Sequence, residues 1–161
     1  MPFFYDLNRA ETTNGSANTV STHFWGKTAA NQETVGIYGL YAASRFATAG
    51  GAQLRLSHNT GTTASGGTAQ TPAPKNLRGN PAAQSSWSND GAAITAGTTL
   101  ITRLSVGFAQ TGGMGGYVPI VPTAAVQMMP NATNPVDVEI TSDASTASVT
   151  FDLTIDIGEG I

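Results

Sequence analysis

Apolar and polar residues alternate at the end of the chain. Between residues 149 and 157 every second residue is apolar, and Thr or Asp fills the positions between them. A period of two over nine residues predicts a β-strand with one buried face. The same alternation runs through residues 136–141, and the turn-forming residues 142–146 separate the two segments. We expect an antiparallel hairpin with its apolar side chains inside and its acidic side chains outside.

Shorter alternating segments upstream predict further strands. They lie at residues 20–24, 35–41, 54–56 and 103–108. Residues 117–121 are also extended in pattern, but Pro119 cannot donate a ladder hydrogen bond, which places this segment at a sheet edge, at a bulge or just outside the sheet. No window of a dozen residues keeps a helical period, and only residues 42–48 favour a single helical turn. Seven or eight short strands predict an all-β fold, an antiparallel β-sandwich or jelly roll, with an up-and-down barrel as the alternative.

Two segments lack the alternation. Residues 1–19 join an aromatic cluster to a polar stretch, and residues 58–87 are built of small polar residues, Gly and Pro. Such composition is typical of flexible or polyproline-like chain, and long structureless loops in a compact domain tend to be functional or disordered. We expect an extended N-terminal arm (1–19) and one long loop (58–87) on a single β domain spanning residues 1–161.

Composition narrows the possible functions. Only 11% of the residues are charged, against about 25% in ordinary soluble domains. Cysteine is absent, which excludes disulfides and thiolate metal sites. The sequence has neither the basic and aromatic clusters of a nucleic-acid-binding surface nor an apolar segment of about 20 residues. We therefore expect no contact with nucleic acid or membrane, and the start of the chain, which lacks a signal-peptide pattern, predicts synthesis in the cytoplasm.

Charge is distributed unevenly along the chain. All seven basic residues precede residue 104, where four acids also lie, giving +7 − 4 = +3; the remainder holds six acids and no base, giving −6. Such a separation can orient a protein on a partner or pair its subunits. Strands distant in sequence can also interleave and cancel it, and the sequence leaves both interpretations open.

Few residues offer catalytic chemistry. The two histidines are His23, within a strand segment, and His58, at the start of the long loop. A Ser-His-Asp arrangement depends on spatial proximity and can escape sequence analysis, but no nucleophile-elbow pattern supports one. We expect both histidines to be ordinary strand-end or loop residues and the chain not to be an enzyme.

Four acidic residues share strand faces in pairs. Asp137 and Glu139 lie on one face of their strand, and Asp152 and Asp156 lie on one face of theirs. If the strands were neighbours, these carboxylates could imitate a paired-carboxylate or Ca²⁺ site, but the spacing matches no cation-binding loop. We expect a solvated acidic face without metal or cofactor, and we interpret the glycine-rich residues 112–116 as a wide turn rather than a phosphate loop.

Several segments of the second half occur in a characteristic order. They are TPAPKNLRGNPAAQSSWS (71–88), LITRLSVGFAQTGG (100–113), a Gly-Tyr-Val-Pro stretch, and SVTFDLTIDIGEG (148–160). In this order they resemble the head decoration, or cement, proteins of tailed bacteriophages, which are small β-rich virion structural proteins. The resemblance covers residues 70–161. It implies a sandwich or jelly roll on the outer surface of the capsid, often a homotrimer, that clamps neighbouring major capsid protein subunits.

A protein of this kind would bind through aromatic anchors rather than ion pairs, because the chain carries so little charge. The candidate partner-binding residues are Phe3, Phe4 and Tyr5 in the arm, and Arg78 and Trp87 in the long loop. The alternative is that the aromatic side chains fill the domain's own core.

Two other functional classes stay open. One is a receptor- or carbohydrate-binding jelly-roll module of a phage tail or fibre. His23, Trp25, Tyr38 and Tyr41 offer partial material for its site. The other is a hydrolase, which would need His23 or His58.

Overall fold

The computed structural model describes residues 3–14, 20–28, 35–45, 51–76, 79, 81–98, 100–109, 114–117, 126–128, 137–144 and 149–160. Within these ranges the chain forms twelve strands and no helix. The strands are β1 (Phe3–Asn14), β2 (Val20–Lys27), β3 (Val35–Ser44), β4 (Gly51–Asn59), β5 (Ser65–Gln70), β6 (Ala73–Pro74), β7 (Ser86–Thr95), β8 (Leu100–Ala109), β9 (Met114–Tyr117), β10 (Val126–Met128), β11 (Val138–Ala144) and β12 (Val149–Glu159).

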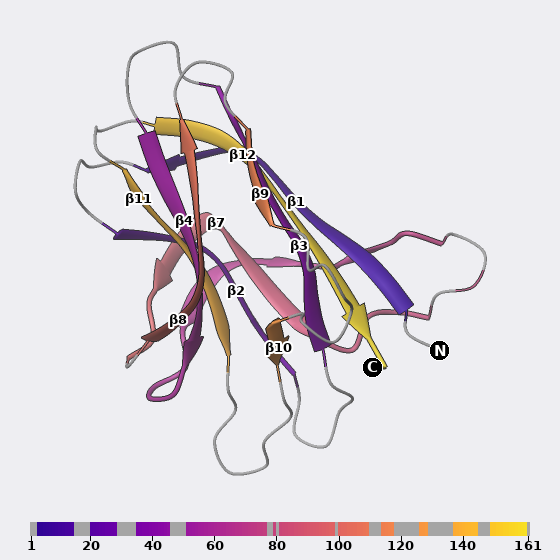
Figure 1. The fold of residues 1–161 in the computed structure, drawn as a ribbon. Coiled ribbons are helices and arrows are strands. Elements are labelled where there is room, and N and C mark those ends of the chain that lie inside the picture. Colours follow the sequence, from indigo (N-terminus) through magenta and orange to yellow (C-terminus); the bar gives the residue numbers. More distant parts are fainter. Residues whose placement is uncertain are drawn as a thin grey trace.

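The strands form two antiparallel sheets packed face to face (Figure 1). Sheet A has the order β10-β3-β12-β1-β6, and β9 pairs with another part of β3. Sheet B has the order β5-β7-β2-β11-β4-β8. The chain changes sheet at each step from β1 to β4, and strands far apart in sequence therefore become neighbours. The predicted all-β antiparallel sandwich is confirmed.

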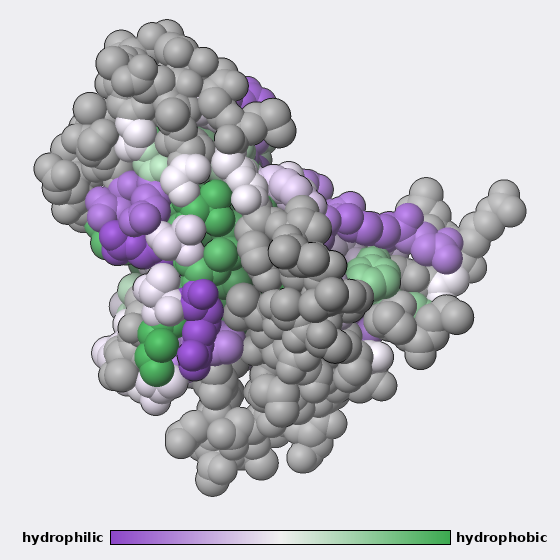
Figure 2. All heavy atoms as spheres, in the orientation of Figure 1, coloured by the Kyte–Doolittle hydropathy of each residue, from purple (hydrophilic) through white to green (hydrophobic). Residues whose placement is uncertain are grey.

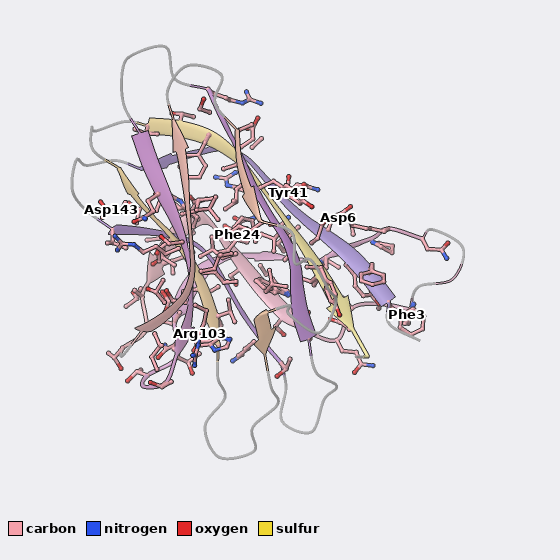
Figure 3. All side chains as sticks on the ribbon, in the orientation of Figure 1. Phe3, Asp6, Phe24, Tyr41, Arg103 and Asp143 are labelled. Atoms are coloured by element: carbon pink, nitrogen blue, oxygen red, sulfur yellow. The ribbon has the colours of Figure 1, made fainter. Side chains whose placement is uncertain are left out.

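One continuous hydrophobic core lies between the sheets. Every second residue of β12 from Val149 to Ile157 is buried, which confirms the predicted apolar face of this strand. Phe24 of β2 lies in the middle of the sandwich (Figure 3) and is fully buried. Each such side chain contributes about 1.5–3 kcal/mol through burial. The strands expected near residues 20–24, 35–41, 54–56 and 103–108 are present as β2, β3, β4 and β8.

The predicted C-terminal hairpin is wrong. β11 pairs with β2 and β4 in sheet B, whereas β12 pairs with β1 and β3 in sheet A. The chain crosses between the sheets after residue 144. β11 also includes residues 142–144, which the sequence pattern assigned to a turn. Alternation identified the strands but carries no information about which strand lies beside which.

The predicted N-terminal arm is also wrong for residues 3–14. They form β1, which pairs along its length with β12 and, near its start, with β6. Tyr5 and Leu7 are fully buried in the core. A strand in the middle of a sheet needs partners on both sides, and the partner strand of this one lies about 150 residues away, beyond the reach of a local pattern.

The predicted long loop contains regular structure. β5, β6 and the first residues of β7 lie within residues 58–87, and β5 pairs with β7. The expected helical turn at 42–48 is strand as far as Ser44, and residues 46–50 lie outside the described residues. Residues 114–116, expected in a wide turn, belong to β9 together with Tyr117, while 118–121 also lie outside the described residues.

Candidate functional site: the loop end of the sandwich

The candidate arm and loop residues meet at one end of the molecule. Here β1 begins, β12 ends, and residues 71–85 run between β5 and β7. Phe3 pairs with Glu159, and Tyr5 pairs with Pro74. In Figure 1 the segment between β5 and β7 projects beyond the start of β1. We call this region the loop end.

The carboxylate of Glu159 fastens the loop to the sandwich. It accepts hydrogen bonds from the N–H groups of Gln84 (2.8 Å) and Ser85 (2.9 Å) and from the Ser85 hydroxyl (2.6 Å). Glu159 and Ser85 are both buried. Hydrogen bonds to an ionised acceptor are about twice as strong as those between neutral groups. The returning part of the loop is therefore held in place rather than free.

Tyr5 and Trp87 reinforce this attachment from within the core. The Tyr5 hydroxyl donates to the carbonyl oxygen of Pro81 at 3.0 Å, and burial, followed by the charge of Glu159, raises the pKa of Tyr5. Trp87 is only 3% exposed, and its Nε1–H donates to Ser85 Oγ at 2.9 Å. These two candidate anchors fill the domain's own core, which is the alternative that the sequence left open.

The other candidate anchors differ in exposure. Phe4 is 38% exposed and meets the ring of Tyr38 edge-on, with 5.3 Å between the ring centroids. Phe3, at the start of β1 in Figure 3, is partly buried against the core. Arg78 lies outside the described residues. Phe4 is thus the candidate aromatic that the structure leaves most accessible.

A groove of about 230 Å³ runs beside the attachment. Its walls come from the end of β5 with Thr71 and Pro72, and from Ser85, Ser86 and Trp87 at the start of β7. Pro72 and Trp87 are themselves buried, so Gln70, Thr71 and Ser86 are the more accessible polar residues along this groove.

A second polar cluster lies inside the sandwich, where His23 joins two strands of sheet B. Its Nδ1 is 2.7 Å from Asp90 Oδ2, and its Nε2 is 2.6 Å from Ser142 Oγ. Arg9 of sheet A donates to Asp90 at 2.8 Å. Burial disfavours the charged form of Asp90, but the hydrogen bonds and charges of His23 and Arg9 outweigh this effect and hold its pKa below the ordinary value.

This cluster has the connectivity of a Ser-His-Asp triad. Its members come from β2, β7 and β11, so sequence spacing gave no signal for it. His23 and Ser142 are both fully buried, and the ring of His23 packs edge-on against Phe151 at 5.2 Å. A cleft of about 380 Å³ reaches His23 and Asp90, but Ser142 is not among its lining residues. The arrangement links the two sheets, and its serine is buried away from the cleft.

The remaining histidine lies at the surface side of β4. His58 Nδ1 accepts a hydrogen bond from Arg103 Nε at 3.2 Å. Arg103 lies on β8, the edge strand of sheet B (Figure 3). The two histidines thus belong to separate environments, and the expectation that His23 is an ordinary strand-end residue is wrong because its ring is part of the core.

Asp137, just before β11, and Glu139 within it are buried instead of solvated. Asp137 accepts the N–H of Ala64 at 3.0 Å, and Glu139 accepts the N–H of Gly97 at 2.7 Å and the hydroxyl of Thr22 at 3.3 Å. Burial is the main reason that the pKa values of both carboxyl groups are raised. The predicted acidic outer face is therefore wrong for this strand.

The acids of β12 lie in the other sheet and pair with bases from the first half of the chain. Asp152 binds Arg45 at 2.7 Å, and Asp156 binds Lys75 at 2.8 Å. The uneven charge distribution of the sequence is thus partly cancelled in space. Among the described residues no group of three or more His, Asp or Glu side chains could hold a metal ion.

Figure 2 shows hydrophilic and hydrophobic residues interspersed on the described surface. In the part of the chain that the structure describes, no helix is long and apolar enough to cross a membrane. No protein family model, curated protein or solved structure matches the chain.

Proposed function

We propose that the chain is a capsid decoration, or cement, protein that binds the outer surface of an assembled tailed-phage head. It would stabilise contacts between major capsid protein subunits and act without catalysis. Binding only to the assembled lattice stabilises that lattice by mass action, and many copies add many small contributions.

The observation that carries this proposal is the fastened loop at the loop end. Glu159 and Tyr5 fix residues 81–85, whereas three residues nearer the start of the loop, Lys75, Asn76 and Gly79, are exposed. A loop that is held before binding loses less conformational entropy when a partner meets it. The N–H of Lys75 donates to the carbonyl oxygen of Phe4 at 3.0 Å, so the loop begins next to a residue whose ring is exposed, and aromatic residues are enriched in protein interfaces.

The strand order supports a finer description of the fold. β1-β12-β3-β9 and β2-β11-β4-β8 are two four-stranded runs, and successive strands of these runs lie in opposite sheets except for β4 and β8, which pair with each other. We infer a jelly roll in which β5, β6 and β7 form an insertion between β4 and β8 that extends both sheets. Jelly rolls are common in viral capsid proteins.

The sealed state of the His23 cluster supports a role without catalysis. A nucleophile must reach the substrate, and Ser142 is fully buried among core residues. We accordingly assign the cluster a structural role in joining the two sheets.

Quantitative mass spectrometry of purified phage particles tests the proposal. We expect one copy of this chain for each one to few major capsid subunits, and a homotrimer by light scattering of the purified chain. A ratio of only a few copies per particle would contradict a cement role and favour a receptor-binding module of the tail or fibre.

A variant pair connects the copy number to the loop end. The double variant Phe4→Ala, Arg78→Ala should bind fewer copies than wild type to phage heads that lack the native protein. Ile101→Ala, at an exposed position of β8, should bind as many copies as wild type. Equal binding of wild type and both variants would show that the loop end is not the contact surface.

The receptor- or carbohydrate-binding alternative also gains one specific observation. Tyr38 and Tyr41, two of its candidate residues, are both partly exposed on β3 of sheet A.

A further inference from the structure

Three aromatic side chains share the outer face of sheet A. Phe4 of β1 and Tyr41 of β3 alternate with the buried residues Tyr5 and Leu40, and therefore project away from the core. Tyr38 stands at a bulge in β3, between the residues that pair with Asp156 and Ile157 of β12. We call these three residues, with the polar side chains between them, the aromatic face.

Both tyrosine rings lie close against glycine backbone. A Cβ atom at Gly158 would come within 2.7 Å of Cε2 of Tyr38, and one at Gly39 would come within 2.6 Å of Cε2 of Tyr41. Any other residue at these two positions would push the rings away from the sheet. The sequence thus lets two tyrosines lie down on the sheet surface, where each remains partly exposed.

The polar groups between the rings orient one another. Lys75 Nζ lies 3.0 Å from Asp6 Oδ1 and 2.8 Å from Asp156 Oδ2, and the Tyr41 hydroxyl donates to Asp156 Oδ2 at 3.4 Å. On the next row of the sheet, Thr154 donates to Asn8 Oδ1 at 2.8 Å. Figure 3 shows Asp6 and Tyr41 on neighbouring parts of this sheet.

Charge sets the chemistry that this face accepts. Asp6 and Asp156 against Lys75 leave a net charge of −1 near the rings, which disfavours an anionic ligand. A protein interface core is depleted of charged residues, whereas here three charged side chains lie among three aromatic ones. A ligand with apolar C–H faces and many hydroxyl groups satisfies both kinds of surface.

We propose that the aromatic face binds neutral oligosaccharides. Sugar rings would lie against Tyr38 and Tyr41, and their hydroxyl groups would bond to Asp6, Asp156 and Asn8, whose positions are already fixed by their neighbours. Preorganised groups lose little entropy on binding. This activity goes beyond capsid decoration, and a decoration protein with it would also attach the particle to surface polysaccharides.

The experiment is binding of the full chain to an array of neutral oligosaccharides of glucose, galactose, mannose and N-acetylglucosamine. The strongest binder is then titrated calorimetrically into wild type and variants. We expect Tyr38→Ala and Tyr41→Ala each to weaken binding by about tenfold, which corresponds to about 1.4 kcal/mol, because each variant removes the ring on which a sugar would lie. Asp156→Asn should weaken it less, since the amide keeps one acceptor.

Trp25→Ala is the matched control. Trp25 was also a sequence candidate for a sugar site, but it lies in sheet B, away from the aromatic face of sheet A; it is partly exposed, and its Nε1–H donates to the carbonyl oxygen of Gly66. The thermal unfolding of each variant is measured, and binding is compared only between variants that are folded at the titration temperature, so that unfolding is not mistaken for lost binding. Absence of binding to every glycan of the array, or a loss with Trp25→Ala and not with Tyr38→Ala, overturns the proposal. Neither result affects the copy number that tests capsid decoration.

Discussion

β11 and β12 follow one another along the chain and both alternate apolar with acidic residues, yet their acidic side chains lie in different surroundings. On β12, Asp152 and Asp156 remain partly exposed and pair with an arginine and a lysine. Asp137, just before β11, and Glu139 on it are fully buried and accept backbone N–H groups at Ala64 and Gly97.

The difference comes from what covers each strand. Both strands lie in the interior of their sheets, but the connections around Ala64 and Gly97 contact the outward side of β11, while the outer face of sheet A stays partly open. A backbone donor cannot move to find another acceptor, whereas an arginine or lysine at the surface can turn to water. Asp137 and Glu139 therefore hold loops in place, whereas Asp152 and Asp156 adjust a surface.

The largest effect should follow Asp137→Ala. It leaves the buried N–H of Ala64 without its acceptor, and an unsatisfied buried donor costs about 1–3 kcal/mol. We expect the free energy of unfolding, measured with urea, to fall by about 2–3 kcal/mol. Asp137→Asn keeps one acceptor oxygen and should lose less. Equal losses for both variants would show that the hydrogen bond is not the cause.

Glu159 is an acid of β12 that holds a loop in the same way as Asp137 and Glu139. It is buried and holds two backbone N–H groups of the loop. Glu159→Ala should lower the free energy of unfolding by about 1–2 kcal/mol, since the freed N–H groups can become hydrated near the surface. Limited proteolysis should cut residues 71–85 faster than in wild type. An unchanged cleavage rate would contradict the role of Glu159 as the fastening of the loop.

A smaller effect is expected in the pH dependence of stability, through Glu139. Its pKa is higher in the folded protein than in the unfolded chain, so the folded state binds its proton more tightly. This contribution is present below the unfolded pKa, about 4.3, and is lost as the pH rises through the higher folded pKa.

Comparison with Glu139→Gln isolates that contribution. Relative to the variant, wild type should be more stable near pH 4 than near pH 7, as urea unfolding across this range will show. The pKa of Asp90 is lowered in the folded protein, so its contribution to stability changes with pH in the opposite direction. That contribution should be the same in wild type and in Glu139→Gln and should cancel in the comparison. A stability difference that does not vary with pH would mean that Glu139 titrates normally.

The smallest effect should follow Asp152→Ala. Its partner Arg45 has a side chain that is 47% exposed, and surface ion pairs contribute about 0.2–1 kcal/mol. We expect a change in the free energy of unfolding of less than about 0.5 kcal/mol, reduced further in 0.5 M salt. A loss as large as that of Asp137→Ala would remove the distinction between the two strands.

The sequence predicted the buried face of β12 and the presence of β2, β3, β4 and β8 because alternation is a local property. It failed for β1, whose residues Phe3–Tyr5 resembled an arm, because a strand in the middle of a sheet is defined by partners distant in the chain. It also failed for β5, whose glycines and small residues carry no apolar alternation at all.

At the candidate site, the sequence identified Phe4, Tyr5 and Trp87 as important aromatic residues without separating the exposed ring from the two buried ones. The fastening by Glu159 and the His23 cluster could not be foreseen, because each brings together residues more than 60 positions apart. Tyr38 and Tyr41 were candidates for a sugar site, but only the structure shows the glycines on which they lie.

The pairing of β1 with β12 has a consequence for how the protein is made. Sheet A cannot close until β12 has left the ribosome, so β1 must wait, with its apolar side chains uncovered, while every strand from β2 to β11 is synthesised. Folds dominated by such non-local pairing reach the native state in milliseconds to seconds, and their waiting strands are open to aggregation. If many copies are produced rapidly, the yield of folded protein would then depend on chaperones as well as on the stability of the folded β-sandwich.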